Sequence, residues 1–373
     1  MRFLAFTLAM LLGCLNAHAQ SPELSIAETT KLIQKARSSA LDPRGWAIDL
    51  LDVLRVHSLP QSRENICSSI AIIDQESNFV SDPAVAGLGA LAERTLRAKA
   101  DRVPIIGRMA LQFLETTPSA KDSYMERIRS ARTERDLDMT YRSMVEDASN
   151  KASLSIVVQS GLLNQLIEDR NDINTIGSMQ VSVKFAIENA KQTRWLPMSL
   201  KDVYAVRDEL YTRRGGMYYG VLQLLGYESG YARKIYRFAD YNAGRYASRN
   251  AAFQNIISML SNVKLTKDGD LLLYDRDQRA LKAVSQSERA LRSIISSRHL
   301  NIDDKQLRGD LLREKDADFT ATRTYESIRN LTKQPAFAEV PSIELTSPKI
   351  KHHMTTRNFA ESVEKRYLRC MGK

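Results

Sequence analysis

The size and composition of this chain limit its architecture. With 373 residues, 43% of them hydrophobic, it is long enough for one large domain or two and can bury a sizeable core. Its 16 Gly and 10 Pro are few for this length and argue against a linker-rich or repeat-β architecture. The formal net charge of +10 favours a polyanionic partner, but Lys and Arg are scattered rather than clustered with aromatic residues, so nucleic-acid binding is not indicated.

Residues 1–19 have the pattern of a secretory signal. Arg2 precedes a mostly apolar run from Phe3 to Leu15, and Ala17-His18-Ala19 forms a cleavage site before Gln20. The apolar run is too short to span a bilayer, which needs about 20 residues. We therefore expect export to the periplasm, where the positive charge suits carboxylate-bearing peptidoglycan or anionic lipid head groups better than nucleic acid.

A second processing site overlaps the first. Leu11-Leu12-Gly13-Cys14 resembles the lipobox of bacterial lipoproteins, in which the signal ends at residue 13 and a lipid on Cys14 provides outer-membrane attachment. We prefer cleavage after Ala19, because the lipoprotein signal would be unusually short and Leu12 is not the preferred residue type at its position. Lipidation of Cys14 stays as the alternative.

Removal of the signal leaves two cysteines, Cys67 and Cys370. In an oxidising compartment they can pair, and the bridge would tie the final helix to an early one. The alternative is two unpaired thiols, with Cys67 buried in a helix. The sequence does not supply the Cα separation that would decide, so both readings stay open.

Helical spacing of apolar residues dominates the chain and predicts a mainly α fold. Between the signal and residue 265 we expect a single domain that includes a charge-dense helical insertion over residues 81–175. Around that insertion, helices are predicted over residues 25–39, 45–56, 60–79, 151–164, 181–191 and 218–225.

Residues 266–373 are predicted to form a C-terminal helical extension. Leu265 to Tyr274 has Lys267-Asp268-Gly269-Asp270 between apolar flanks, which predicts a small hairpin. Polar helical stretches follow beyond Ser285, then an extended segment over residues 335–348 and a final helix over 355–370.

The first motif with chemical potential is the end of the helix predicted over 60–79. Glu76 follows Ile70 and Ile73 at the edge of the buried face. Apolar neighbours desolvate an ionised carboxylate and raise its pKa, as a general acid requires. Taken alone, Glu76 reads as an ordinary helix-end residue.

Two further motifs follow, and each alone reads as an ordinary structural feature. Gly177-Ser178-Met179-Gln180 suits a turn that presents an amide, which can donate to and accept from sugar hydroxyls and N-acetyl groups. Tyr241-Asn242-Ala243-Gly244 offers a hydroxyl that can orient an acid and an amide that can bind an acetamido group.

Glu-Ser, then Gly-x-Met-Gln, then Tyr-Asn-Ala-Gly resembles, in that order, the soluble lytic transglycosylase family of the lysozyme-like superfamily. The resemblance covers three short motifs between residues 66 and 250. It implies a lysozyme-like helical core with a small hairpin and extra helices, acting on peptidoglycan glycan strands. Carried over, it makes Glu76 the catalytic acid and base, and Ser77, Met179, Gln180, Tyr241 and Asn242 the substrate-binding residues.

The resemblance also implies a one-carboxylate reaction. Glu76 protonates the oxygen of the β-1,4 bond between N-acetylmuramic acid and N-acetylglucosamine while the 2-acetamido group assists. The ionised Glu76 then takes the proton of the 6-hydroxyl, which closes a 1,6-anhydro ring, whereas glycosidases usually need two carboxylates. No cofactor or metal is expected, and His352 and His353 are expected to face solvent.

Three features depart from the family pattern. Residues 81–175 separate the first two motifs, the Pro that often follows Gly-x-Met-Gln is replaced by Val181, and a second Glu-Ser pair, Glu228-Ser229, follows Gln180. Motif order favours Glu76 over Glu228. A hydrolytic muramidase on the same fold and a non-catalytic peptidoglycan-binding envelope protein remain the alternatives.

Overall fold

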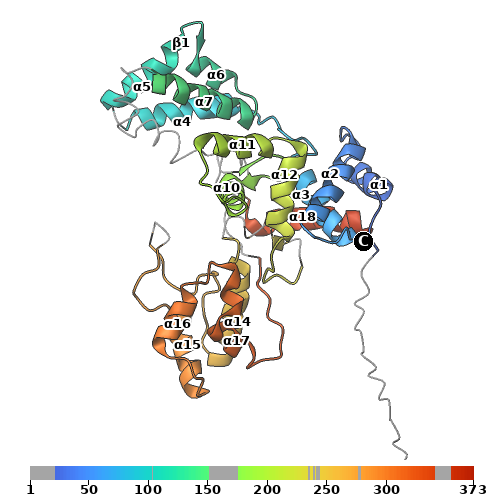
Figure 1. The fold of residues 1–373 in the computed structure, drawn as a ribbon, viewed down its shortest axis with the longest axis vertical. Helices are drawn as coiled ribbons and strands as arrows, with labels where there is room; N and C mark the ends of the chain where they lie inside the picture. Colours follow the sequence, from blue (N-terminus) through green and yellow to red (C-terminus); the bar gives the residue numbers. More distant parts are fainter. Residues whose placement is uncertain are drawn as a thin grey trace, which may run out of the picture.

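The structure is a computed structural model, and it describes residues 22–102, 104–150, 175–233, 236–237, 240, 244–275, 279–340 and 354–373. This described part is mainly helical, which confirms the predicted mainly α fold. Figure 1 shows the helices gathered in three groups, and each group has its own cluster of buried hydrophobic residues. We name these groups the central, insertion and lower lobes. None of the described helices is long and apolar enough to cross a bilayer.

The central lobe combines segments that are far apart in the sequence. It contains the helices α1 (Ile26–Ala36), α2 (Pro43–Val56), α3 (Arg63–Glu76), α10 (Val183–Gln192), α11 (Leu200–Leu210), α12 (Arg213–Leu225) and α18 (Thr356–Met371), and the antiparallel hairpin of β3 (Thr175–Ile176) and β4 (Val181–Ser182). All of these elements contribute buried side chains to one hydrophobic core.

Helix α3 runs through the middle of this core. The Ser62 hydroxyl caps its N-terminus by accepting from the Asn65 N–H, and every residue from Asn65 to Asp74 is buried. Its isoleucines lie on more than one face, as expected of a helix enclosed on all sides. It packs against α1, α12 and α18.

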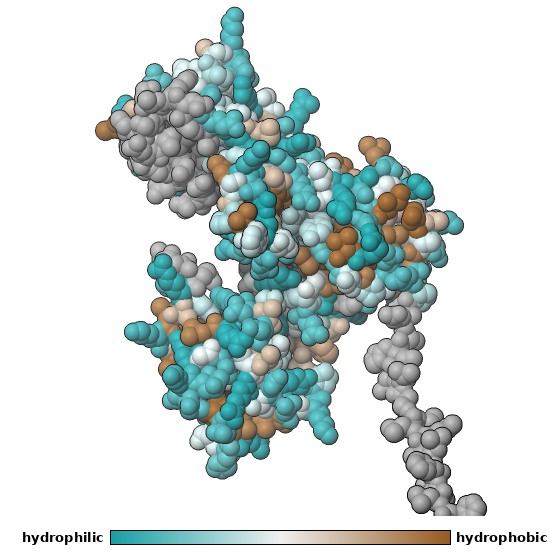
Figure 2. Space-filling view, viewed as in Figure 1, coloured by the Kyte–Doolittle hydropathy of each residue, from teal (hydrophilic) through white to brown (hydrophobic). Residues whose placement is uncertain are grey.

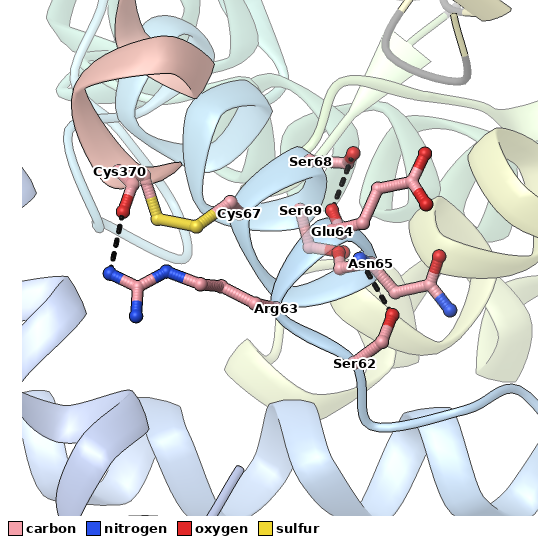
Figure 3. Close-up of a disulfide and its surroundings, with 8 residues drawn as sticks. All are labelled: Ser62, Arg63, Glu64, Asn65, Cys67, Ser68, Ser69 and Cys370. Atoms are coloured by element: carbon pink, nitrogen blue, oxygen red, sulfur yellow. Dashed lines mark hydrogen bonds between the residues drawn. A yellow bond between two sulfur atoms is a disulfide. The ribbon is translucent and has the colours of Figure 1, made fainter. Parts of the chain in front are cut away.

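Helix α18 is fastened along α3. Of the two readings of the cysteines, the structure has the disulfide between Cys67 and Cys370 (Figure 3). Further along α3, the buried Asp74 carboxylate accepts from Arg366 of α18 at 3.0 Å and from Arg37 at 2.7 Å. The Ser362 hydroxyl of α18 donates to the Gln75 side chain at 3.0 Å. These contacts reach the last turn of α3 and hold it in place.

The insertion lobe consists of α4 (Leu88–Ala100), α5 (Pro104–Thr116), β1 (Pro118–Ser119), β2 (Asp122–Ser123), α6 (Tyr124–Ser130) and α7 (Glu134–Asn150). A small core that includes Phe113, Tyr124 and Met144 holds it together. It joins the central lobe through Asp138 of α7, which accepts from Arg207 of α11 at 2.8 Å. The helix predicted over 151–164 lies outside the described residues.

The lower lobe consists of α14 (Ala247–Ser261), α15 (Gln286–Ser297), α16 (Asp304–Leu311), η3 (Ala317–Ala321) and α17 (Arg323–Arg329). Phe253 of α14 lies in the same core as Leu291 and Phe319. The core of the lower lobe therefore extends across the predicted domain boundary at residue 265. The lower lobe begins before it, because the apolar face of α14 is buried against α15 and α17, and α18 belongs to the central lobe.

The hairpin predicted over residues 265–274 is wrong. This segment wraps around the buried carboxylate of Glu314, which accepts from the backbone N–H groups of Leu271 and Leu272 and from the Tyr274 hydroxyl at 2.6 Å. Backbone donors that a partner strand would use are satisfied by a side chain instead. In the described residues, the paired strands are the short ones at 118–123 and 175–182.

Candidate functional site

Glu76 is the last residue of α3 and is half-buried. The chain turns sharply directly after it, because Asn78 and Phe79 both adopt the left-handed region, with φ of 52° and 64°. This conformation is uncommon for residues other than Gly and tends to be retained at functional sites. The carboxylate therefore stands where a buried helix ends and the backbone leaves the core.

Phe79 anchors this turn. Its ring is buried and meets the Trp46 ring edge-on, with centroids 5.3 Å apart. The Arg213 guanidinium lies 5.8 Å from the Trp46 ring and donates to Asp49 at 2.5 Å, which links α12 to α2 behind the turn. Burial of Phe79 offsets the conformational cost of two successive left-handed residues, which is about 1–3 kcal/mol each.

The second motif is the turn between β3 and β4. Gly177 has φ of 80° and Gln180 has φ of 49°. The Gln180 side chain braces the turn, because its Nε2 donates to the Gly177 carbonyl at 3.3 Å and its Oε1 accepts from the Thr175 hydroxyl at 2.9 Å. An amide has two N–H donors and two acceptor positions, so each end of this half-buried group retains capacity for a ligand.

Glycines on α12 admit this hairpin into the core. A Cβ atom on Gly220 would lie 2.5 Å from the Met179 sulfur, and one on Gly216 would lie 3.0 Å from the Ser178 hydroxyl. Helix α12 also packs against α3, so the first two motifs rest on the same helix. The spacing of glycines in Arg213–Leu225 was the available sequence signal for this close approach.

Two predicted substrate-binding residues are not available to a substrate. Met179 is 0% exposed and fills the space left by Gly220, so it is a core residue. Ser77 is almost fully buried, and its hydroxyl and its N–H both donate to the Ile73 carbonyl at 3.0 Å. Both residues support their motifs from within the core. The prediction that they contact substrate is therefore wrong, and both are core residues.

Tyr241 and Asn242 of the third motif lie outside the described residues, but both flanks of the motif are described. The Gly244 N–H donates to the Asp240 carbonyl at 2.9 Å, which joins the two ends. The Asp240 carboxylate is buried and accepts from the Ser248 hydroxyl at 2.6 Å and the Tyr227 hydroxyl at 2.8 Å. Desolvation raises the pKa of Asp240 to about 6, against the opposing effect of these hydrogen bonds.

The segment that leads to the third motif is attached to the central lobe. Tyr231 is buried in the central core, and the Tyr236 hydroxyl donates to Glu364 of α18. Arg233 forms an ion pair with the same Glu364. Helix α18 therefore holds both the helix that ends at Glu76 and the segment that precedes Tyr241.

A cluster of aromatic and basic side chains lies beside the third motif. The Arg245 guanidinium lies 5.0 Å from the Phe185 ring of α10, 5.2 Å from the Tyr227 ring and 5.9 Å from the Tyr246 ring. A guanidinium over aromatic faces keeps hydrogen-bond donors for an anion. The sequence reasoning missed this cluster, because Phe185 is about 60 positions from Arg245 and no local spacing connects them.

The second Glu-Ser pair, Glu228-Ser229, does not lie at the end of a buried helix as Glu76 does. Glu228 is exposed in the segment after α12, and the Ser229 hydroxyl accepts from Arg237 at 3.2 Å. In the described part of the chain, no group of three or more His, Cys, Asp or Glu residues is arranged to hold a metal ion. His352 and His353 lie outside the described residues.

Comparison with known proteins gives two matches. A family described as "Protein of unknown function (DUF1615)" matches residues 39–373. A protein of Escherichia coli (strain K12), described as "Uncharacterized protein YaiW", is 35% identical over 371 residues, which cover 97% of this chain and 95% of that protein. No solved structure matches the chain.

Proposed function

The chain belongs to the DUF1615 family, whose function is unknown, and from the order of its three motifs in the sequence and the placement of the first two we propose that it is a periplasmic peptidoglycan lytic transglycosylase. One observation carries the proposal. Glu76 ends a helix that is buried from Asn65 to Asp74 and stands at a left-handed turn, and the Gln180 hairpin packs against the same helix, α12, that supports α3. Motifs that are separated by the insertion lobe in sequence thus share one core.

In the proposed reaction, the protonated Glu76 carboxyl gives its proton to the glycosidic oxygen as that bond breaks. The substrate's 2-acetamido group stabilises the anomeric carbon. The Glu76 carboxylate then accepts the proton of the 6-hydroxyl, whose oxygen bonds to the anomeric carbon, so the product is a 1,6-anhydromuramoyl end and Glu76 is protonated again. This is general acid and base catalysis by one group.

The surrounding residues support such a role. An acid that serves twice must keep its position, and Glu76 is held by the disulfide, the Asp74–Arg366 ion pair and the Ser362–Gln75 hydrogen bond along α3. Gln180 has amide capacity left for sugar hydroxyls or the acetamido group. We propose that Tyr241 orients the acid and that Asn242 binds the acetamido group.

The test is cleavage of purified murein sacculi by the mature chain, followed by mass spectrometry of the fragments. We expect anhydro-ended muropeptides from the wild type. Glu76→Gln keeps the shape of the side chain but removes its proton transfer, so cleavage should fall by about 10²–10⁴-fold. Glu228→Gln, the same substitution in the exposed Glu-Ser pair, is the matched control and should cleave like the wild type.

Each other outcome contradicts part of the proposal. Reducing ends in place of anhydro ends would make the protein a hydrolytic muramidase. Intact sacculi that retain both the wild type and Glu76→Gln would leave only a peptidoglycan-binding role. Undiminished cleavage by Glu76→Gln would remove Glu76 from the reaction.

A further inference from the structure

The connection between α10 and α11 exposes its hydrophobic residues to solvent. Trp195 is 94% exposed, Leu196 is 66% exposed and Leu200, the first residue of α11, is 59% exposed. All residues from Lys191 to Pro197 are exposed. The other tryptophan of the chain, Trp46, is buried. Full exposure of a large aromatic side chain beside two leucines marks an interaction surface rather than a packing position.

Positive charge flanks these hydrophobic residues. Lys191 lies at the end of α10 and Lys201 near the start of α11, and both are exposed. Neither forms an ion pair with any residue that the structure describes. Arg194, by contrast, is paired with Asp202 at 2.7 Å. The loop therefore combines an apolar tip with two ammonium groups that are available to an anionic surface.

Two hydroxyl groups of the loop are engaged in local hydrogen bonds. The Ser199 hydroxyl donates to Asp202 at 2.7 Å, as part of the cap of α11, and the Thr193 hydroxyl donates to the Ala190 carbonyl at 3.0 Å. A sugar-binding platform needs polar side chains beside its aromatic ring to bind hydroxyl groups. Here Trp195 is followed by Leu196, a proline and a methionine, and its one charged neighbour, Arg194, is paired with Asp202, which favours an apolar environment.

We propose that residues 191–201 form a membrane-docking loop that inserts Trp195 and Leu196 into the interface of an anionic bilayer. Lys191 and Lys201 then face the lipid head groups. Tryptophan prefers this interface because its ring is apolar and its indole N–H is polar. Lysines next to the membrane surface add electrostatic attraction to anionic lipids, and salt screens this attraction. The loop does not include Glu76, so this proposal stands apart from the proposed reaction.

The test uses the chain from Gln20 onward, so that no lipid anchor or signal contributes, and vesicles of phosphatidylethanolamine with phosphatidylglycerol. Tryptophan fluorescence is recorded for the wild type and for Trp195→Phe, which retains only the buried Trp46. We expect a blue shift on addition of vesicles in the wild type and none in Trp195→Phe. Substitution of both Trp195 and Leu196 by Ser should lower the vesicle-bound fraction at least about tenfold in sedimentation.

Two controls make the result specific. Leu41→Ser changes a leucine that is 82% exposed elsewhere on the surface, in the connection between α1 and α2, and should leave binding unchanged. Figure 2 shows hydrophobic groups on the part of the surface formed by α1 and α2. The control therefore tests whether any exposed hydrophobic residue is enough for binding. Lys191→Gln with Lys201→Gln should weaken binding to the anionic vesicles and reduce its dependence on salt.

The proposal fails if the wild type does not bind the vesicles or if the double Ser variant binds as well as the wild type. It also fails if Leu41→Ser weakens binding equally, since exposed hydrophobicity in general would then explain it. A Trp195 shift caused by murein fragments and not by vesicles would make the loop a sugar platform. Cleavage of sacculi by Glu76 is measured separately and is not altered by any of these outcomes.

Discussion

Asp240 places a buried carboxyl group directly before the third motif. It accepts from the Tyr227 hydroxyl and from the hydroxyl and N–H of Ser248, and the Tyr231 hydroxyl also stabilises its anion. Burial of a carboxylate favours its neutral form, and this effect exceeds the stabilisation of the anion by these donors. Folding therefore leaves Asp240 with a pKa of about 6, above its ordinary value of 3.8.

This shift predicts a specific dependence of stability on pH. Because this pKa is higher in the folded state, Asp240 binds more protons in the folded protein than in the unfolded chain between about pH 4 and pH 6, so its contribution to the free energy of unfolding rises as pH falls through this window. The contribution of Asp240 is about 3 kcal/mol over the whole window. Denaturant unfolding of the wild type and Asp240→Asn at pH 7 and pH 4.5 measures it.

Asp240→Asn cannot titrate, so the change in the free energy of unfolding from pH 7 to pH 4.5 should be less favourable in this variant than in the wild type. Other carboxylates titrate in the same range, but they are common to both proteins and cancel in the comparison. Equal changes in the free energy of unfolding of the two proteins would show that Asp240 is ionised in the folded state down to its ordinary pKa.

Motif order predicts Glu76 and Gln180 as site residues, but it does not tell a substrate contact from a core residue. Met179 and Ser77 belong to the same motifs as these residues. The burial of Met179 depends on Gly220, which is distant in sequence, and that of Ser77 on the turn at Phe79, which is a matter of backbone conformation. Asp240 was not predicted for a similar reason. Its environment is made by Tyr227 and Ser248, and no local pattern indicates that they surround it.

At the scale of elements, the β3–β4 hairpin depends on one glycine. Gly177 has a left-handed φ of 80°, and a Cβ atom there would lie 2.2 Å from the Leu210 carbonyl oxygen. Gly177→Ala should therefore lower the free energy of unfolding by at least about 2 kcal/mol, from backbone strain and from displacement of the hairpin. Cleavage of sacculi should fall as well if the hairpin carries Gln180 into the site.

Gly309→Ala is the matched control for this prediction. Gly309 lies inside α16, and a Cβ atom there meets no atom within 4 Å. Alanine is the better helix former, so this variant should gain about 0.5–1 kcal/mol. Thermal or denaturant unfolding measures the stability of both variants. A Gly177→Ala protein as stable as the wild type would contradict the described turn.

Elements with strong local signals agree well with their predictions. Helices predicted over 25–39, 45–56 and 355–370 correspond to α1, α2 and α18 within a few residues, because caps such as Ser25 and Thr355 and apolar spacing define them locally. The segment 265–274 did not become a hairpin, since Glu314, more than 40 positions away from Leu271, supplies its hydrogen-bond acceptor. A distant acceptor of this kind leaves no trace in the turn sequence.

At the scale of the whole molecule, a buried ion network connects the insertion lobe to the central lobe. Asp138 of α7 is almost fully buried and pairs with Arg142 of its own helix and Arg207 of α11. Arg142 reaches across to Asp208 of α11 at 2.8 Å. Removal of the Asp138 carboxylate would leave the buried Arg207 guanidinium without the carboxylate that it pairs with and Arg142 with Asp208 alone, which is strongly destabilising.

Asp138→Ala should therefore lower the free energy of unfolding by about 3–5 kcal/mol. Asp122→Ala removes an exposed partner of Arg127 in the same lobe and should leave the free energy of unfolding nearly unchanged, because solvent screens an exposed ion pair. Denaturant unfolding followed by circular dichroism compares the two variants. Similar losses in both would mean that the network at Asp138 contributes no more than a surface ion pair.

The position of α18 has a consequence for how the protein is made. Ser362 meets Gln75 and Arg366 meets Asp74 across nearly 300 positions of sequence, at 287 and 292. Contacts of such separation form late, and a ribosome or an export channel delivers α18 only after both other lobes. Until then α3 lacks a helix that packs against it, and Glu76 lacks the contacts that hold the end of α3 in place. Under the proposed reaction, a chain whose C-terminal helix has not yet been delivered cannot cleave peptidoglycan.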